Sequence, residues 1–257
     1  MRKSPQYPVP ALEKGLDVLE TLAAVSVPQS LAELSARLER SSSELFRMLN
    51  CLESRGYILR DRVSGRYSLT LKLYSLAHTH SVEEKLLRAA RRPMQDLAEA
   101  LRESCHLSVL DRGSLLVLAQ QESPERVRVS IEVGGQFDPV ETASGRLLLA
   151  QLGEVERAEV LRVSPSGRRL SGRSLGSWSS GLEEIRRRGF ASAEGETIEG
   201  VRDHAVLVGN AESGIVAALA VTRLLRRGQR GRDDALIAAM KTTASEITGT
   251  LGLAAAA

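Results

Sequence analysis

The sequence predicts an α+β protein that begins with a winged helix-turn-helix and continues, through a linker helix, into a larger domain of helices and strands. Two short helical patterns joined by a polar turn occupy residues 30–54, and Gly56 follows them. Two short strand patterns then flank Ser64-Gly65. Beyond Cys105, strand-like and helix-like segments alternate, which is typical of an α+β domain.

The helix-turn-helix is indicated by apolar spacing and by helix caps. Residues 11–24 have an apolar stripe at helical spacing. Ser30, with Glu33 three residues later, forms a capping-box pattern at the start of the second helix. Residues 40–43 form the turn before the third helix. The expected cap of that helix is Ser42 or Ser43, and its expected core residues are Leu45, Met48, Leu49 and Leu52.

The wing and the linker follow directly. Residues 57–60 and 66–69 are expected to form two strands around a turn at residues 63–65. The helical pattern after them begins with a linker helix at residues 71–77, and Pro93 stands where a new helix can start. A helix-turn-helix of this kind places its third helix in the DNA major groove. The module therefore predicts a DNA partner.

The larger domain is expected to combine a sheet with helices on both sides. The segment Ser164–Ser180 is rich in Ser, Gly and Arg and is expected to be a loop, and Asn210–Ser213 is expected to be a hairpin turn. Expected strands are residues 107–110, 115–121, 126–133, 190–193, 202–208 and 214–221, and expected helices are residues 143–152, 155–163, 182–188 and 233–251.

Composition and charge narrow the class of protein. Apolar residues make up 42% of the 257, enough for real cores, and no apolar run reaches the ~18 residues of a membrane span. The start of the chain has no apolar signal region, and two cysteines favour a reducing, cytoplasmic setting. The formal charge of +3 lies entirely in residues 1–80, with eleven Lys/Arg and eight Asp/Glu, whereas the rest has twenty-four of each. This placement supports a nucleic-acid partner for the first domain.

Several sequence segments together resemble the IclR-type bacterial transcription regulators. GLDVLETLA, SLAELSARL, SSSELFRMLNCLESRGYI and SGRYSLTLKL resemble the N-terminal domain of that family. ETASGRLLLAQL, RRRGFASAEGETIEGVRDHAVLV and SGIVAALAV resemble its GAF-like effector-binding domain. The resemblance implies a winged helix-turn-helix at residues 1–70, a linker helix at 71–82 and an effector domain at 83–257.

The resemblance implies a regulator that binds a palindromic operator as a homodimer or homotetramer and is modulated by a small metabolite. No catalytic constellation is convincing in the sequence, so no enzymatic activity and no cofactor are expected, and the lack of a long apolar run predicts no membrane partner. An alternative is a small-molecule sensor or protein-interaction module without specific operator binding.

Candidate DNA contacts follow from the outward face of the third helix and from the wing. Arg47 is suited to bind guanine or a phosphate, and Asn50 to contact a base. Glu44 can accept from cytosine or simply favour the helix start, and Phe46 can touch a thymine methyl or fold against the wing. The alternative for the candidate arginines of this domain is that they are solvated surface residues. The candidates are Ser30, Arg40, Ser42, Ser43, Glu44, Phe46, Arg47, Asn50, Arg60, Arg62 and Arg66.

Candidate effector contacts are carried over from the resembling family. Helix amides near Ser144 are suited to a carboxylate. The sequence departs from the family pattern at two places. One is the tripeptide Asp203-His204-Ala205, and the other is the last strand, where Ala220 and Thr222 replace a frequent pair of serines. A carboxylate at Asp203 disfavours an acidic effector and favours a hydroxyl or amine ligand, unless Asp203 pairs with a neighbouring arginine or faces solvent. The candidates are Ala143, Ser144, Gly145, Val201, Asp203, Ala220 and Thr222.

Other chemistry finds little support. His78 and His80 lack a third ligand nearby, so no metal site is expected. Cys105 and His106 have the residue types of a nucleophile and a base, but neighbours on a strand point to opposite faces. The same alternation separates Asp203 from His204. Neither a Walker loop nor a Gly-x-Gly-x-x-Gly motif occurs.

Overall fold

The computed structural model describes residues 9–25, 27–77, 82–195, 198–210, 214–225 and 233–252. The chain divides into two compact units, Met1–Ser81 and Val82–Ala257. Each unit has its own hydrophobic core. Within the described ranges, no helix is both long and apolar enough to cross a membrane.

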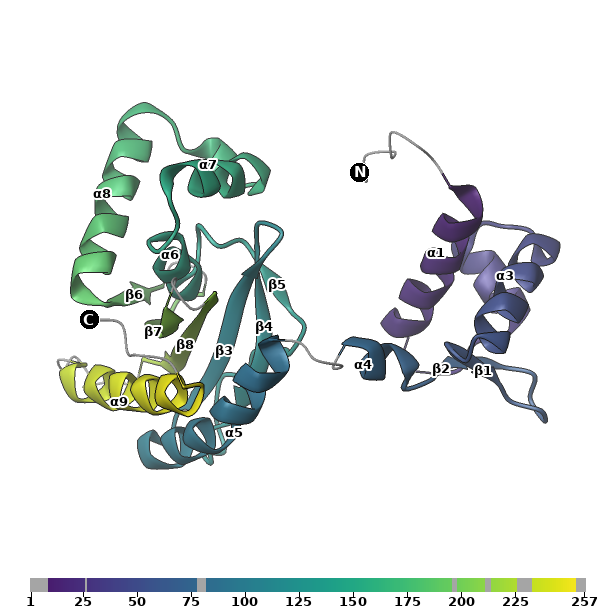
Figure 1. Cartoon of the computed structure of the whole chain (residues 1–257), viewed down its shortest axis with the longest axis horizontal. Coiled ribbons are helices and arrows are strands. Elements are labelled where there is room, and N and C mark those ends of the chain that lie inside the picture. Colours follow the sequence, from purple (N-terminus) through teal and green to yellow (C-terminus); the bar gives the residue numbers. More distant parts are fainter. Residues whose placement is uncertain are drawn as a thin grey trace. The chain divides into compact units, whose positions relative to one another are not determined.

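The N-terminal unit is a winged helix-turn-helix (Figure 1). A small core formed by all three main helices and both strands holds it together. That core consists of Val18, Leu22, Leu34, Leu45, Leu49, Ile58 and Tyr67. The elements are α1 Pro10–Ala24, α2 Leu31–Leu38, α3 Ser42–Ser54, the antiparallel pair β1 Ile58–Arg60 and β2 Tyr67–Leu69, and the linker helix α4 Lys72–Ala77.

Helix caps fix where α2 and α3 begin. Ser30 and Glu33 form the expected capping box, with the Ser30 amide donating to the Glu33 carboxylate at 2.7 Å and the Glu33 amide to the Ser30 hydroxyl at 3.2 Å. The cap of α3 is Ser41, whose hydroxyl accepts from the Glu44 amide. The expectation of Ser42 or Ser43 was therefore wrong by one or two residues, because Ser41 is the last residue with extended backbone.

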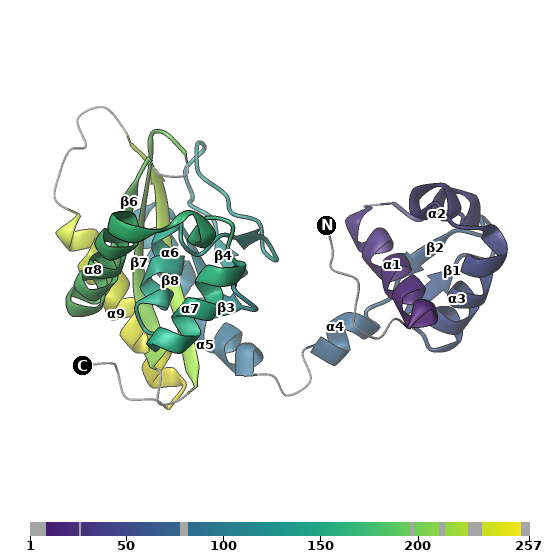
Figure 2. The same ribbon diagram turned by 90° about the horizontal axis from the view of Figure 1, so that it is seen from above.

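The C-terminal unit is built on one six-stranded sheet in the order β5-β4-β3-β8-β7-β6, in which all neighbours are antiparallel. Helices cover both faces, as Figures 1 and 2 show. The α+β prediction is confirmed. The strands are β3 Ser104–Asp111, β4 Ser114–Gln121, β5 Gln136–Phe137, β6 Phe190–Glu194, β7 Val201–Asn210 and β8 Ile215–Leu224.

Two helices cover one face of the sheet and α6 covers the other. Helices α5 Val82–Leu101 and α9 Asp234–Thr250 pack together against β3, β7 and β8. Helix α6 Ala143–Leu149 packs against β6, β7 and β8 on the opposite face, with α8 Gly172–Arg188 behind it. Helix α5 runs through Pro93 without interruption, so no new helix starts there. The remaining helical segments are α7 Glu154–Val163 and a 3-10 turn at Gly167–Arg169.

Two segments differ from the sequence prediction. Residues 126–133 form no strand, although they carry apolar residues at alternate positions, and the short β5 follows instead. The expected loop at 164–180 contains the first half of α8, because Trp178 and Leu182 pack onto Val140 and Leu149. Of the expected turn at 210–213, residues 211–213 lie outside the described residues, as do His78, His80 and residues 226–232.

Candidate DNA-reading face and effector cavity

Helix α3 buries one side and exposes the other. Leu45 and Leu49 are fully buried in the small core, whereas Phe46, Arg47 and Asn50 are exposed. Within the described part of the chain, Arg47 forms no hydrogen bond or ion pair. Its guanidinium is therefore available to a partner, and the exposed stripe has the residue types that contact base edges.

The start of α3 is tied to the helices before it. The Lys14 ammonium forms an ion pair with the Glu44 carboxylate at 2.6 Å, and Ser41 also donates to that carboxylate. The ammonium is the main reason that the pKa of Glu44 lies below its usual range. The Ser42 hydroxyl lies 3.1 Å from that of Ser35. Glu44 thus joins α1 to α3. From the sequence, Glu44 is expected to contact a base or to favour the helix start.

The wing is held by its own turn. Asp61 accepts hydrogen bonds from the Val63 amide at 3.1 Å and from the Ser64 amide and hydroxyl at 2.7 Å each. These bonds, the Ser64 amide above all, hold the pKa of Asp61 below its usual range. Gly65 adopts a positive φ of 67°, which closes the turn. The wing tip is therefore a defined turn.

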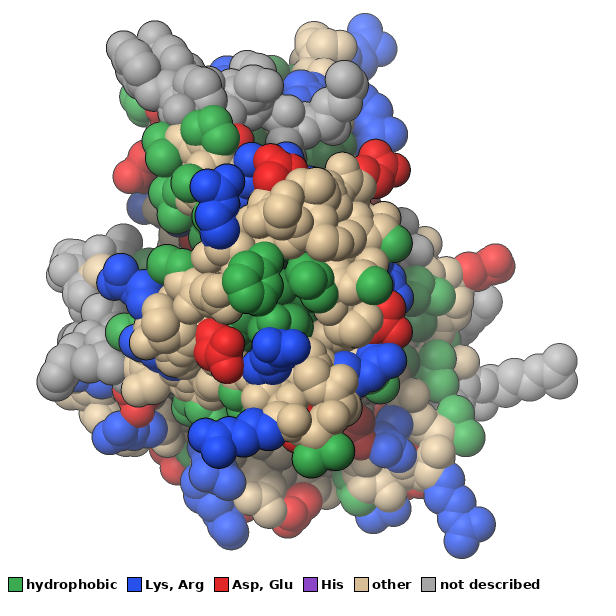
Figure 3. All heavy atoms as spheres, turned by 90° about the vertical axis from the view of Figure 1, so that its right-hand side faces the viewer, with side chains coloured by type: hydrophobic (Ala, Val, Ile, Leu, Met, Phe, Trp, Pro, Cys, Tyr) green, Lys and Arg blue, Asp and Glu red, His purple; other side chains and the backbone are tan. Residues whose placement is uncertain are grey.

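The candidate arginines differ in how they are engaged. Arg66 donates to both oxygens of Glu33, at 2.8 and 3.1 Å, and to the Pro28 carbonyl at 2.8 Å. Arg40 pairs with Asp17 at 3.3 Å. Arg60 lies over the Tyr67 ring, 5.5 Å from its centroid, and Arg62 is exposed. Figure 3 shows one face of the molecule, on which separate Lys and Arg side chains have acidic and uncharged groups between them.

The C-terminal unit has a partly enclosed, mainly apolar cavity of about 100 Å³ between the start of α6 and the sheet. The segment before β5 contributes Val129 and Ile131 to its wall. Gln120 holds that segment in place, because its side chain accepts from the Ile131 amide at 2.5 Å and donates to the Ser130 hydroxyl at 2.7 Å. The lining comprises His106, Leu115, Val117, Val129, Ile131, Phe137, Thr142, Ala143, Ser144, Ile198, Val201, Asp203 and Thr222.

Polar groups of the cavity lie on neighbouring strands. Thr222 donates a hydrogen bond of 2.5 Å to Asp203, its direct partner in the β7–β8 pairing. His106 on β3 also lines the cavity, and burial lowers its pKa to about 4. At neutral pH the imidazole is therefore uncharged. Sequence reasoning had placed Asp203 and Thr222 here and had missed His106, whose facing depends on the sheet register.

Five of the seven candidate effector residues line this cavity, and Gly145 and Ala220 do not. Ala220 is buried in the core beneath α6. The Gly145 amide donates to the Thr142 hydroxyl at 3.0 Å, and a Cβ at Gly145 would lie 2.2 Å from the Pro139 carbonyl oxygen. The glycine thus allows close packing, and its amide is already bonded to Thr142. The expected role of Gly145 and Ala220 in the lining was therefore wrong.

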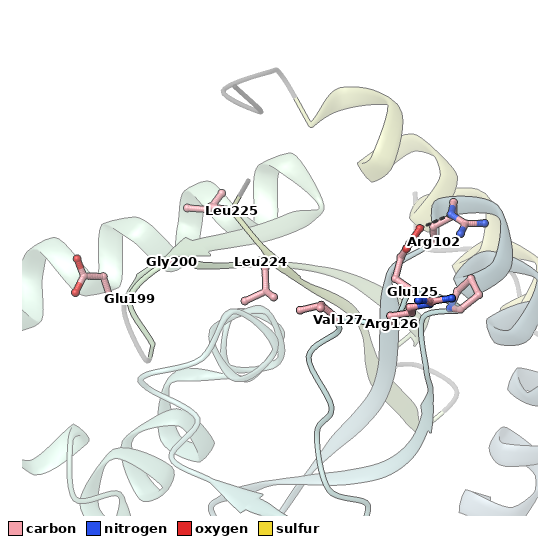
Figure 4. A pocket seen from close by; sticks show the side chains of 9 residues that line it. Arg102, Glu125, Arg126, Val127, Glu199, Gly200, Leu224 and Leu225 are labelled. Carbon is pink, nitrogen blue, oxygen red and sulfur yellow. Dashed lines mark hydrogen bonds and ion pairs between the residues drawn. The ribbon is translucent and has the colours of Figure 1, made fainter. Parts of the chain in front are cut away.

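A wider, open hollow of about 820 Å³ lies at the end of β8. Figure 4 shows Leu224 and Val127 pointing toward one another, with Arg102 bonded to Glu125 on one side and Glu199 on the other. Its charged groups do not converge on one point. The smaller, partly enclosed cavity, with apolar walls and polar groups on adjacent strands, is the better ligand site.

The opposite face of the same strands has a separate polar network. His204 lies 2.7 Å from the Ser192 hydroxyl through Nδ1 and 3.0 Å from Asp233 through Nε2. Arg202 and Arg223 both pair with Asp233. Burial and these two arginines lower the pKa of His204 to about 4. The network joins β6, β7 and β8 to the start of α9.

The side chains of Cys105 and His106 lie on opposite faces of the sheet, because successive side chains of a strand alternate between its faces. Cys105 packs among the side chains of α5 and α9, and burial raises the pKa of its thiol to about 12. His106 faces the cavity. The two side chains therefore cannot act together as nucleophile and base.

Comparison with protein families assigns both units. The model of the bacterial transcriptional regulator IclR C-terminal domain matches residues 78–249, and that of the IclR helix-turn-helix domain matches residues 11–62. The chain belongs to the IclR family. It is a DNA-binding transcriptional regulator with an effector-binding domain, and not an enzyme.

Relatives of this regulator align with it over most of the length of both chains. The HTH-type transcriptional regulator KdgR of Escherichia coli is 28% identical over 225 residues, covering 86% of this chain and 85% of that protein. The glycerol operon regulatory protein of Streptomyces coelicolor is 27% identical, with 95% and 97% covered. The structure of an IclR homolog from Microbacterium hydrocarbonoxydans, complexed with 4-hydroxybenzoate, is 25% identical with a TM-score of 0.77, covering 94% and 99%.

Proposed function

We propose that this regulator binds a palindromic operator in the cytoplasm as a homodimer or homotetramer and that a small molecule in the partly enclosed cavity beside α6 modulates its binding. Each part of the chain has its own role, with the domain boundaries that the sequence predicts. Residues 1–70 bind DNA, residues 71–82 link the domains and residues 83–257 bind the effector. The exposed stripe of α3, where Arg47 forms no hydrogen bond or ion pair with any described residue, is the observation that carries this proposal.

Contacts to DNA divide into base reading and backbone positioning. Arg47 and Asn50 read base edges, and Phe46 touches an apolar base edge such as a thymine methyl. Hydroxyls at the start of α3 and the wing arginines contact phosphates and set the register. The phosphate set is Ser42, Ser43, Arg60 and Arg62. Arg40, Arg66, Ser30 and Glu44 hold the module in shape, because each forms an ion pair or a capping-box hydrogen bond within the protein.

Exposed apolar side chains in the N-terminal unit support self-association. Leu12 and Leu16, one turn apart on α1, are 59% and 46% exposed. Tyr74 and Leu76 of α4 and Leu71 before it are exposed as well. Burying such groups against a second copy is favourable. Two copies would present their α3 helices to successive major grooves, about 34–36 Å apart.

Modulation requires that the effector binds two states of the oligomer with different affinity. The cavity wall includes Thr142, Ala143 and Ser144 at the start of α6. A ligand that fills the cavity favours the conformation in which this wall and the sheet close around it. The linker transmits that preference to the DNA-binding modules.

The test is a selection of genomic fragments by the purified full-length protein at two salt concentrations. Enrichment of a palindromic site by the wild type supports the proposal. Sequence-independent binding that disappears at the higher salt would contradict it and would favour a sensor without specific operator binding.

A further inference from the structure

His106 is a buried polar side chain without a partner. It is 8% exposed, it lines the cavity, and it forms no side-chain hydrogen bond with any residue that the structure describes. Neutral imidazole offers one N–H donor and one acceptor nitrogen. Both nitrogens can be reached from the cavity, and a ligand that pairs with them between apolar walls gains more than it would in water.

The sheet register places His106 where a ligand can reach it. Its direct partner on β8 is Ala220, and the next residue of β8 on that face is Thr222, which is bonded to Asp203. Directly paired residues of antiparallel strands lie on one face. Ala220 offers only a methyl group beside the imidazole. Across β3, β8 and β7 the polar side chains therefore form a short strip on an otherwise apolar floor.

The size of the cavity limits the ligand. Its volume of about 100 Å³ is of the order of a cavity that takes up a single benzene ring, about 150 Å³. The walls around the polar strip are aliphatic or aromatic, with Leu115, Val117, Ile131 and Phe137 among them. The cavity therefore has room for no more than one small ring with a single polar substituent.

The charge of the lining decides which polar substituent fits. None of the described lining residues is a lysine or an arginine, and Asp203 contributes a carboxylate. The Gly145 amide, which a carboxylate could have used, donates to Thr142. A hydroxyl group both donates and accepts, so it matches a neutral imidazole in either tautomer.

We propose that His106 anchors the hydroxyl group of a small, uncharged phenol in this cavity, where Asp203 and the lack of a lysine or arginine among the described lining residues disfavour a carboxylate. This inference rests on the proposed function of the cavity as the effector site. The ring of the phenol lies against the apolar walls, and its hydroxyl pairs with the imidazole beside the Thr222–Asp203 pair.

The first test compares ligands on the wild-type, full-length protein by titration calorimetry. The probes are phenol, toluene, benzoate and cyclohexanol. Phenol is expected to bind about tenfold more tightly than toluene, which lacks the hydroxyl, and benzoate is expected to bind most weakly. Equal affinity for phenol and toluene, strongest binding of benzoate, or cyclohexanol binding as tightly as phenol would each overturn the proposal.

Two variants separate the role of His106 from a general effect on packing. His106→Phe keeps a ring but removes both hydrogen-bonding atoms, so phenol should lose about tenfold in affinity while toluene binding is retained. His106→Gln keeps a donor and an acceptor and should retain the preference for phenol. If His106→Phe still prefers phenol over toluene, His106 does not anchor the hydroxyl.

Operator binding separates this proposal from the proposed function. Wild-type protein that selects an operator but shows no preference for phenol contradicts only the role of His106. Wild-type protein that prefers phenol but selects no operator contradicts the proposed function and supports the assignment of the cavity.

Discussion

Arg66 and Glu33 connect the wing to the second helix through two parallel hydrogen bonds of 2.8 and 3.1 Å. Glu33 is at the same time part of the capping box of α2, because one of its oxygens accepts from the amide of the cap residue Ser30. One carboxylate thus fixes both the start of the helix-turn-helix and the base of the wing. This shared role explains why an arginine that sequence alone assigns to phosphate contact is engaged inside the protein.

Glu33→Gln is expected to make the N-terminal domain less stable at neutral pH. Glutamine keeps the cap on Ser30 but removes the charge that pairs with Arg66. The Ser30 amide and Arg66 lower the pKa of Glu33 to about 2, against 4.5 without these partners. The wild-type advantage is therefore present above about pH 5, and it is lost as the pH falls toward 2.

Denaturant unfolding of the two proteins between pH 7 and pH 2 measures this effect. The difference in unfolding free energy should shrink steadily below about pH 5. A difference that stays constant over this range would show that the ion pair contributes nothing.

Arg47→Ala is expected to weaken operator binding by roughly 1–3 kcal/mol and to relax the preference for one base, if Arg47 reads guanine. The exposed side chain has no partner to lose among the described residues, so the fold should be unchanged. Arg186→Ala is the matched control, because it removes the same charge from an exposed position on α8.

Gel-shift titrations over single-base variants of the operator decide between base and phosphate contact. Uniform weakening across all operators would assign Arg47 to a phosphate. Equal behaviour of Arg47→Ala and Arg186→Ala would remove Arg47 from the interface.

Much of the N-terminal domain could be predicted because its structure is specified locally. The capping box of Ser30 and Glu33 and the glycine turn of the wing are short-range patterns. The Lys14–Glu44 and Arg66–Glu33 pairs could not be predicted, since each joins residues about 30 positions apart that meet only after folding. The helices, strands and caps of this domain were therefore predictable from the sequence, whereas the ion pairs that connect them arise only in the tertiary structure.

The larger domain was harder to predict because long-range contacts decide its local structure. Residues 126–133 alternate like a strand, yet Gln120 binds the segment through its side chain and no partner strand pairs with it. The Ser- and Gly-rich start of α8 is helical because its later residues pack on α6 and its surroundings. His106 was missed for the same reason, since only the register shows that it faces the cavity.

Gly145→Ala is expected to destabilise the C-terminal domain by roughly 1–3 kcal/mol. The added methyl would lie 2.2 Å from the Pro139 carbonyl oxygen, so α6 or the backbone before it must shift. Gly181→Ala is the control, because nothing lies within 4 Å of its Cβ in the exposed middle of α8. That change should stabilise the protein by roughly 0.5–1 kcal/mol. Thermal unfolding of both variants checks the opposite signs, and equal shifts would contradict the packing role of Gly145.

The C-terminal domain is expected to lose stability as the pH falls from about 6.5 to 4, and His106→Gln should reduce that loss. Burial lowers the pKa of His106 to about 4 from 6.5, so in this range the unfolded chain binds a proton that the folded chain does not. The lowered pKa corresponds to roughly 3 kcal/mol of stability, present above pH 6.5 and lost toward pH 4. His204 has a similarly lowered pKa, so part of the pH dependence should remain in His106→Gln. Unfolding free energies measured at pH 7.5, 6, 5 and 4 check this, and identical pH dependence in both proteins would mean that His106 has an ordinary pKa.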